Sequence, residues 1–191
     1  DDVVTIDFGT LAATTDRINE INALAAQDGI SSITGTLTGV SVADIALLSA
    51  DLSSSNSTIN FTVDEAVTVA QAAGLLAHTN TSSAAIQFSA GISDSLSAYA
   101  TSGSTTSELN SIVAEDVDLV ATVTGTLGSS TQDITDLNAL ATKFDGSGLS
   151  AKVVATISAT KDKLYNSGSA LLTTSTNDAI GITVTDAVSP T

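Results

Sequence analysis

The chain of 191 residues contains no cysteine, methionine or tryptophan, and it has one proline and one histidine. The lack of cysteine excludes disulfide bridges, thiolate metal ligands and thiol nucleophiles. A single histidine, His78, cannot build a His-rich metal site, and we expect it to end a helix, where a partial positive charge suits the dipole. Aromatic residues make up only 3% of the chain, so alanine, valine, isoleucine and leucine must supply the core.

Basic residues are also scarce, with five Lys and Arg against 21 Asp and Glu and a net charge of -16. Residues 1–142 hold 17 of the acids and Arg17 alone, whereas residues 143–191 are neutral with four lysines. This balance argues against nucleic acid and anionic lipid as partners. No run reaches 18 apolar residues, so no membrane insertion is expected. We expect an extracellular or cell-surface location, because the surface is acidic and rich in Ser and Thr.

One motif occurs twice, as GTLAATTDRINEINALA in residues 9–25 and GTLGSSTQDITDLNALA in residues 125–141. Both stretches share G-T-L, a spacer, an isoleucine and a final N-A-L-A. Such self-similarity is the signature of a repeat protein, in which each unit has an open apolar edge and is stabilised by stacking on its neighbours.

Strand-like and helix-like segments alternate along the chain. Apolar alternation and β-branched residues predict strands at 3–8, 32–37, 58–63, 84–89, 119–124, 151–158 and 180–186. Apolar spacing of three and four predicts helices at 14–28, 41–52, 63–77 and 129–144, with Thr15, Ser41 and Ser130 as N-caps. Segments 91–118 and 159–186 share another outline: a short helix, a tyrosine followed by a Gly/Ser break, an apolar piece and a strand.

These patterns predict an α/β fold of repeated strand–helix units with a parallel sheet. Because the strands alternate apolar and Thr-rich positions, we expect helices on one face only, which gives an open β/α solenoid; a doubly wound parallel sheet is the alternative. The chain is expected to form one elongated repeat domain, 1–191. Its approximate units are 1–31, 32–56, 57–83, 84–116, 117–150, 151–178 and 179–191.

The alternation also predicts the buried residues. They are Ile6, Phe8, Ile18, Ile21, Leu24, Ile33, Leu48, Phe61, Val63, Phe88, Val123, Ile134, Leu137, Leu140 and Ile182. The opposite strand face, with Thr62 and Thr124, is expected to lie outside.

The units resemble the repeats of the very large, repetitive cell-surface proteins, adhesin-like or S-layer-like, of marine cyanobacteria. One half of the resemblance lies in TVTGTLGSSTQDITDLNALATK (122–143), and the other in ISDSLSAYATSG (92–103), ISATKDKLYNSG (157–168) and GITVTDA (181–187). The resemblance implies an exported structural protein that tolerates calcium and in some cases serves adhesion or motility. It carries no catalytic residues, and none are assigned.

The one candidate metal site is the acidic stretch EDVD, residues 115–118. Calcium prefers carboxylate and carbonyl oxygens, so Glu115, Asp116 and Asp118 are calcium candidates. No EF-hand or nonapeptide calcium loop accompanies them, and an ordinary solvated acidic turn is the alternative. Calcium is the only cofactor that the sequence suggests.

We therefore expect a structural module of a cell-surface layer, filament or giant adhesin that is not an enzyme. Its partners would be copies of itself or adjacent repeats of a longer chain, stacked end to end and promoted by cations. The alternative is a surface-binding module whose Thr-rich sheet face recognises ice or polysaccharide. The chain begins without a methionine or a leader, so we expect a mature product or an excerpt of a longer protein.

Overall fold

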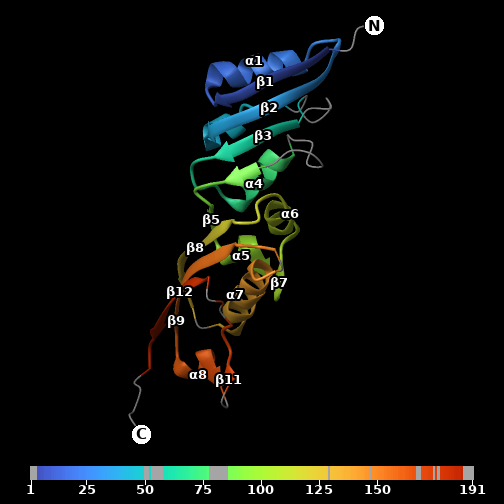
Figure 1. The fold of residues 1–191 in the computed structure, drawn as a ribbon. Helices are drawn as coiled ribbons and strands as arrows, with labels where there is room; N and C mark the ends of the chain where they lie inside the picture. The colour runs from blue at the N-terminus through green and yellow to red at the C-terminus, as the bar shows by residue number, and fades with distance from the viewer. Residues whose placement is uncertain are drawn as a thin grey trace. The chain divides into compact units, whose positions relative to one another are not determined.

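The computed structural model describes residues 4–49, 52, 58–77, 86–128, 130–146, 148–166, 169–173, 175 and 177–186. His78, Asp1 and Asp2 lie outside the described residues. The chain divides into two compact units, residues 1–91 with 114–116 and residues 92–113 with 117–191. Each unit holds a four-stranded sheet in which all pairs are parallel, and helices follow the strands (Figure 1). The expected mixed α/β fold with parallel strands is confirmed.

The sheet of the first unit has the order β1-β2-β3-β4, which is also the order along the chain. Its strands are β1 (Val4–Ala12), β2 (Ile30–Val40), β3 (Thr58–Val63) and β4 (Ile86–Phe88). Its helices are α1 (Thr15–Ala25), α2 (Val42–Ile45) and α4 (Val69–Leu76). Sequential parallel order requires a crossover between each pair of strands, and these helices lie in the crossovers.

The sheet of the second unit has the order β12-β9-β8-β5. Its strands are β5 (Ile92–Asp94), β8 (Val120–Leu127), β9 (Lys152–Ala159) and β12 (Ala179–Val184). Its crossovers contain α5 (Leu96–Tyr99), α6 (Ser107–Glu115), α7 (Thr131–Phe144) and α8 (Lys161–Leu164). Two antiparallel hairpins of two-residue strands, β6 (Ala100–Thr101) with β7 (Ser104–Thr105) and β10 (Tyr165–Asn166) with β11 (Ser169–Ala170), each follow a four-residue helix.

Burial alternates along the inner strands as the sequence predicts. Phe61 and Val123 are 1% and 4% exposed, while Thr62 is half-buried and Thr124 is exposed. The predicted residues that are buried are Ile18, Ile21, Ile33, Leu48, Phe61, Val63, Phe88, Val123, Ile134, Leu137, Leu140. One face of each sheet is therefore packed, and its Thr-rich face is more open.

Four burial predictions are wrong. Ile6, Phe8 and Leu24 are only half-buried, because β1 is the edge strand of its sheet and α1 is its outer helix. Ile182 is 51% exposed, because β12 is the edge strand of the second sheet. Alternation identifies the face to which a side chain belongs, but it does not show whether another element covers that face.

The repeated motif forms the same structure in both units: a strand end, a turn and an amphipathic helix. Gly9 and Gly125 have φ of 66° and 75°, and both lie at a register shift in their sheet. A positive φ favours glycine, which explains the G of G-T-L. Thr14 and Ser130 then cap α1 and α7 by accepting the backbone N–H three residues on, so the expected cap Thr15 is wrong by one residue and Ser130 is confirmed.

The asparagine of N-A-L-A explains the second half of the motif. Asn22 Nδ2 donates to the Leu47 carbonyl at 2.7 Å, and Asn22 Oδ1 accepts from the Ser49 N–H at 3.0 Å. Asn138 makes the same pair of bonds, to the Leu171 carbonyl at 2.7 Å and from the Thr173 N–H at 2.8 Å. Each asparagine thus clamps the loop of the next strand–helix unit to its own helix.

Candidate functional site

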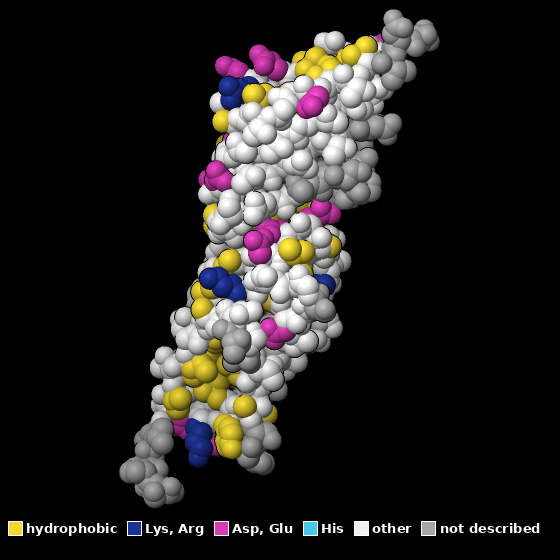
Figure 2. Space-filling view, viewed as in Figure 1, with side chains coloured by type: hydrophobic (Ala, Val, Ile, Leu, Met, Phe, Trp, Pro, Cys, Tyr) yellow, Lys and Arg dark blue, Asp and Glu magenta, His cyan; other side chains and the backbone are white. Residues whose placement is uncertain are grey.

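The most exposed apolar surface in the second sheet is strand β12. Ile182 and Val184 lie directly beside Ile157 and Ala159 of β9 in the parallel register. The β9 residues are both 0% exposed, whereas Ile182 and Val184 are 51% and 45% exposed. The core face of the sheet therefore continues onto β12 and is open there, and Figure 2 shows hydrophobic side chains gathered where β12 lies in Figure 1.

The backbone of β12 is open on the same edge. The Thr185 N–H donates to the Ala159 carbonyl at 3.0 Å, so Thr183 and Thr185 turn their polar backbone groups toward β9. In a parallel ladder alternate residues face opposite sides, which directs the N–H and C=O of Ile182 and Val184 away from β9. Within the described part of the chain no strand pairs with this edge, and such an edge is a template for another strand.

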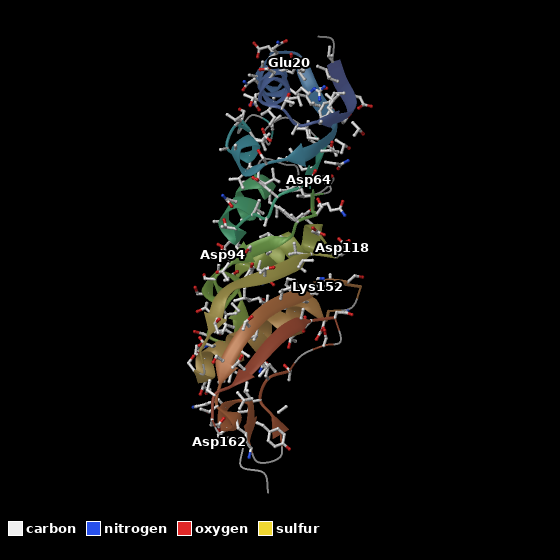
Figure 3. All side chains as sticks on the ribbon, turned by 90° about the vertical axis from the view of Figure 1, so that its left-hand side faces the viewer. Glu20, Asp64, Asp94, Asp118, Lys152 and Asp162 are labelled. Atoms are coloured by element: carbon white, nitrogen blue, oxygen red, sulfur yellow. The ribbon has the colours of Figure 1, made fainter. Side chains whose placement is uncertain are left out.

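Lysines lie near this open edge. Lys161 and Lys163 are exposed on α8, the helix between β9 and β12, and Lys152 is exposed at the start of β9. By contrast, α1 of the first unit carries the exposed acids Asp16 and Glu20; Glu20 and Lys152 are labelled in Figure 3. Asp162 on α8 and Arg17 on α1 add the opposite charge, so each region has only a small excess of one sign.

Several acidic side chains accept hydrogen bonds from backbone N–H groups of the strand or helix that precedes them. Asp178 Oδ1 accepts from the Val153 N–H at 2.9 Å, and Asp186 Oδ1 accepts from the Lys161 N–H at 2.8 Å. In the first unit Glu65 accepts from the N–H of Val42, the first residue of α2. The strongly acidic composition thus has a structural use, because a carboxylate can satisfy backbone N–H groups that a helix leaves unpaired.

The three calcium candidates do not form a metal-ligating group. Asp116 is 3% exposed, and its Oδ2 accepts from the Phe88 N–H at 2.7 Å. Glu115 is half-buried, which raises the pKa of its carboxyl, and Asp118 is exposed. No group of three or more His, Cys, Asp or Glu that could hold a metal occurs among the described residues. Asp116 acts here as a backbone clamp like Asp178.

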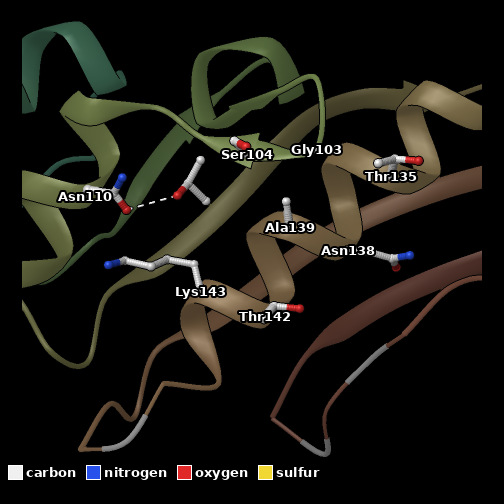
Figure 4. A pocket seen from close by; sticks show the side chains of 9 residues that line it. Gly103, Ser104, Asn110, Thr135, Asn138, Ala139, Thr142 and Lys143 are labelled. Atoms are coloured by element: carbon white, nitrogen blue, oxygen red, sulfur yellow. Dashed lines mark hydrogen bonds between the residues drawn. The ribbon is translucent and has the colours of Figure 1, made fainter.

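A shallow groove of ≈ 650 Å³ runs between α7 and the β6–β7 hairpin (Figure 4). Its lining residues are Gly103, Ser104, Thr105, Asn110, Thr135, Asn138, Ala139, Thr142 and Lys143. Thr105 Oγ1 donates to Asn110 Oδ1 at 3.0 Å, while both amide atoms of Asn138 hold the loop at residues 171–173. The lining holds hydroxyl and amide groups and one lysine, and no Asp, Glu or His is among its residues.

The Thr-rich face of the first sheet forms rows across the strands. The register places Thr10, Thr36 and Asn60 in one row and Ala12, Thr38 and Thr62 in the next. Adjacent strands are about 4.8 Å apart, and alternate residues of one strand are about 6.6 Å apart. Asn60 Nδ2 donates to Thr36 Oγ1 at 3.5 Å, so side chains of one row also interact between neighbouring strands.

The sequence analysis did not predict that Asn22 and Asn138 bind the backbone of a following loop. Their recurrence in N-A-L-A was the signal for this role. The sequence analysis also predicted Ile182 as core, whereas this side chain is 51% exposed on the edge strand β12. Among the described residues, no helix is long and apolar enough to cross a membrane. No protein-family model, curated protein or solved structure matches this chain.

Proposed function

We propose that the chain is an extracellular structural repeat module of a bacterial cell-surface layer, filament or giant adhesin. Its strand–helix units form an open β/α solenoid that stacks end to end on copies of itself or on adjacent repeats. The proposal includes no enzymatic reaction. The observation that carries it is the exposed apolar face of β12, which continues the buried core face of β9.

The recurring clamps support a repeat architecture. Asn22 and Asn138 tie the following loop to their helices, and Glu65 and Asp186 tie the helix of the preceding unit to their own strand. Contacts between neighbouring units are what a solenoid needs, since each unit contacts only its neighbours. Burial of one sheet face favours the open solenoid over a doubly wound sheet, which is covered on both faces.

The oligomeric state of the purified chain tests the proposal. We expect sedimentation velocity to show larger species as protein concentration rises, and Ile182→Asp to abolish them by placing a charge on the apolar edge. Val117→Asp is the matched control, because Val117 is 50% exposed and lies on the loop before β8. A monomer at all concentrations, or assembly of Ile182→Asp equal to that of the native chain, would contradict the proposal.

A second candidate function is binding of a regular hydroxylated surface, ice or polysaccharide, by the Thr-rich face. The observation that favours it is the in-register rows of Thr36 and Thr38 with their neighbours. Asp7, Asn60 and Gln87 interrupt the rows, which weakens the face as an ice-binding surface. Thermal hysteresis and co-sedimentation with insoluble polysaccharide test it, with Thr36→Lys expected to abolish binding and the exposed Thr142→Lys expected to preserve it.

A further inference from the structure

Strand β12 has an internal counterpart in the first unit, strand β3. The sequence T-V-D-E-A-V at 62–67 corresponds to T-V-T-D-A-V at 183–188. Phe61 pairs with Leu37 of β2, as Ile182 pairs with Ile157 of β9. Both strands therefore occupy the same place in a strand–short helix–strand unit.

A side-chain clamp confirms this equivalence. Glu65 follows β3 by two residues and accepts the N–H of the first residue of α2. Asp186 follows β12 by two residues and accepts the N–H of Lys161, the first residue of α8, at 2.8 Å. In both units an acidic residue two positions after the strand thus holds the first residue of the preceding short helix.

The counterparts differ in what covers them. Phe61 and Val63 are 1% and 0% exposed, whereas Ile182 and Val184 are 51% and 45% exposed. In the first unit β4 pairs Ile86 with Phe61 and Phe88 with Val63. The crossover between β3 and β4 contains α4, whose buried residues are Val69, Ala72, Leu75 and Leu76.

We infer that the open face of β12 docks one kind of partner: an amphipathic helix followed by a parallel strand, of the type formed by α4 and β4. The strand would pair with the backbone edge at Ile182 and Val184 and place two apolar residues, two positions apart, beside them. The helix would cover their side chains with an apolar face like that of α4. The inference deepens the proposed function and rests on it for the identity of the partner as a further repeat.

A strand alone does not meet the requirement. Pairing at the edge satisfies N–H and C=O groups, but the exposed side chains of Ile182 and Val184 point to the sheet face, which only an element above the sheet can cover. Two parallel strands are joined by a crossover of a dozen or more residues, which usually contains a helix. The segment 68–91 provides such a helix together with the strand that follows it. For this reason the partner needs both elements.

The test is a chain in which residues 189–191 are replaced by a copy of residues 68–91. The copy continues the match, because Ala187 and Val188 repeat Ala66 and Val67. The matched control carries Val69→Ser, Leu75→Ser and Leu76→Ser in the copy only. Amide hydrogen exchange at Ile182 and Val184 and the melting temperature are measured at a dilution where the native chain is monomeric.

We expect the copy to slow exchange at Ile182 and Val184 by at least about tenfold and to raise the melting temperature, and the control copy to do neither. Unchanged exchange, or equal protection by the control copy, would overturn the inference. Because the copy acts within one chain, a failure of the native chain to assemble leaves this test intact and counts only against the proposed function.

Discussion

At the scale of single residues, the repeated motif is maintained by backbone contacts rather than by apolar packing alone. The asparagine of N-A-L-A offers one donor and one acceptor, and the loop of the next unit uses both. No aspartate or leucine can make this pair of bonds, since the first lacks the donor and the second lacks both. These two hydrogen bonds account for the asparagine that both copies of the motif share, which hydrophobic periodicity does not explain.

Replacement of Asn138 by alanine should lower the free energy of unfolding by about 1–2 kcal/mol, because two hydrogen bonds to backbone groups are lost. Hydrogen exchange should quicken at Thr173, whose N–H loses its acceptor. The control is Asn19→Ala, since Asn19 is exposed on α1. Equal stability of the two variants in urea would show that the clamp contributes nothing.

Gly35 has a steric role in the first sheet. A Cβ at this position would lie 2.4 Å from Cε2 of Phe8, so the aromatic ring occupies the space of a side chain. The pairing of a large residue on the edge strand with glycine on its neighbour explains how Phe8 packs while remaining half-buried.

Gly35→Ala should destabilise the chain by about 1–3 kcal/mol, as overpacking does. In a Phe8→Leu background the penalty should shrink, because the smaller side chain leaves room, and the double-mutant cycle measures this coupling. Gly74→Ala is the control: its Cβ would meet nothing within 4 Å in α4, and the change should be neutral or stabilising. A penalty for Gly35→Ala that is independent of residue 8 would exclude the ring as its cause.

At the scale of helices and strands, hydrophobic periodicity predicted the longer elements and missed the shortest ones. All seven expected strands exist, as do helices within 14–28, 63–77 and 129–144, because each is long enough to show a period. The predicted helix at 41–52 begins after Ser41 as expected, but α2 spans only Val42–Ile45. The hairpins and β5 were missed, since strands of two or three residues have no period.

The candidate site was predicted only in part. Alternation placed Ile182 on the core face correctly, but the absence of cover on that face is a tertiary property that one strand does not encode. Glu115, Asp116 and Asp118 were grouped by sequence proximity, whereas the fold commits Asp116 to the backbone of Phe88. Neighbouring carboxylates are as suited to clamping N–H groups as to binding calcium, and sequence alone does not distinguish the two uses.

Helix α7 should be sensitive to truncation of its packed face. Leu137 is 0% exposed, so Leu137→Ala should cost about 2–5 kcal/mol through lost burial and the cavity left behind. Thr142→Ala, an exposed change on the same helix, should stay within about 0.5 kcal/mol. Urea denaturation of both variants measures the difference; similar midpoints would show that α7 does not pack as described.

At the scale of the whole molecule, charge opposes assembly. The chain carries a net charge of -16, so any stack of copies concentrates negative charge. Burial of Ile182 and Val184 favours association, whereas repulsion between the acidic copies disfavours it. Exposed charges are screened over about 8 Å at physiological ionic strength, so salt weakens the opposing contribution while leaving apolar burial intact.

Self-association should therefore strengthen as sodium chloride rises from about 0.02 M to about 0.5 M, measured by sedimentation velocity at fixed protein concentration. Calcium chloride at matched ionic strength should have the same effect, because the carboxylates of Glu115, Asp116 and Asp118 form no ligand group in the described part of the chain. A larger effect of calcium that Glu115→Gln with Asp118→Asn removes would instead establish a specific site there. Association that weakens with salt would show that attraction between the lysines of α8 and acidic residues such as Asp16 and Glu20 holds the copies together, rather than the apolar face of β12.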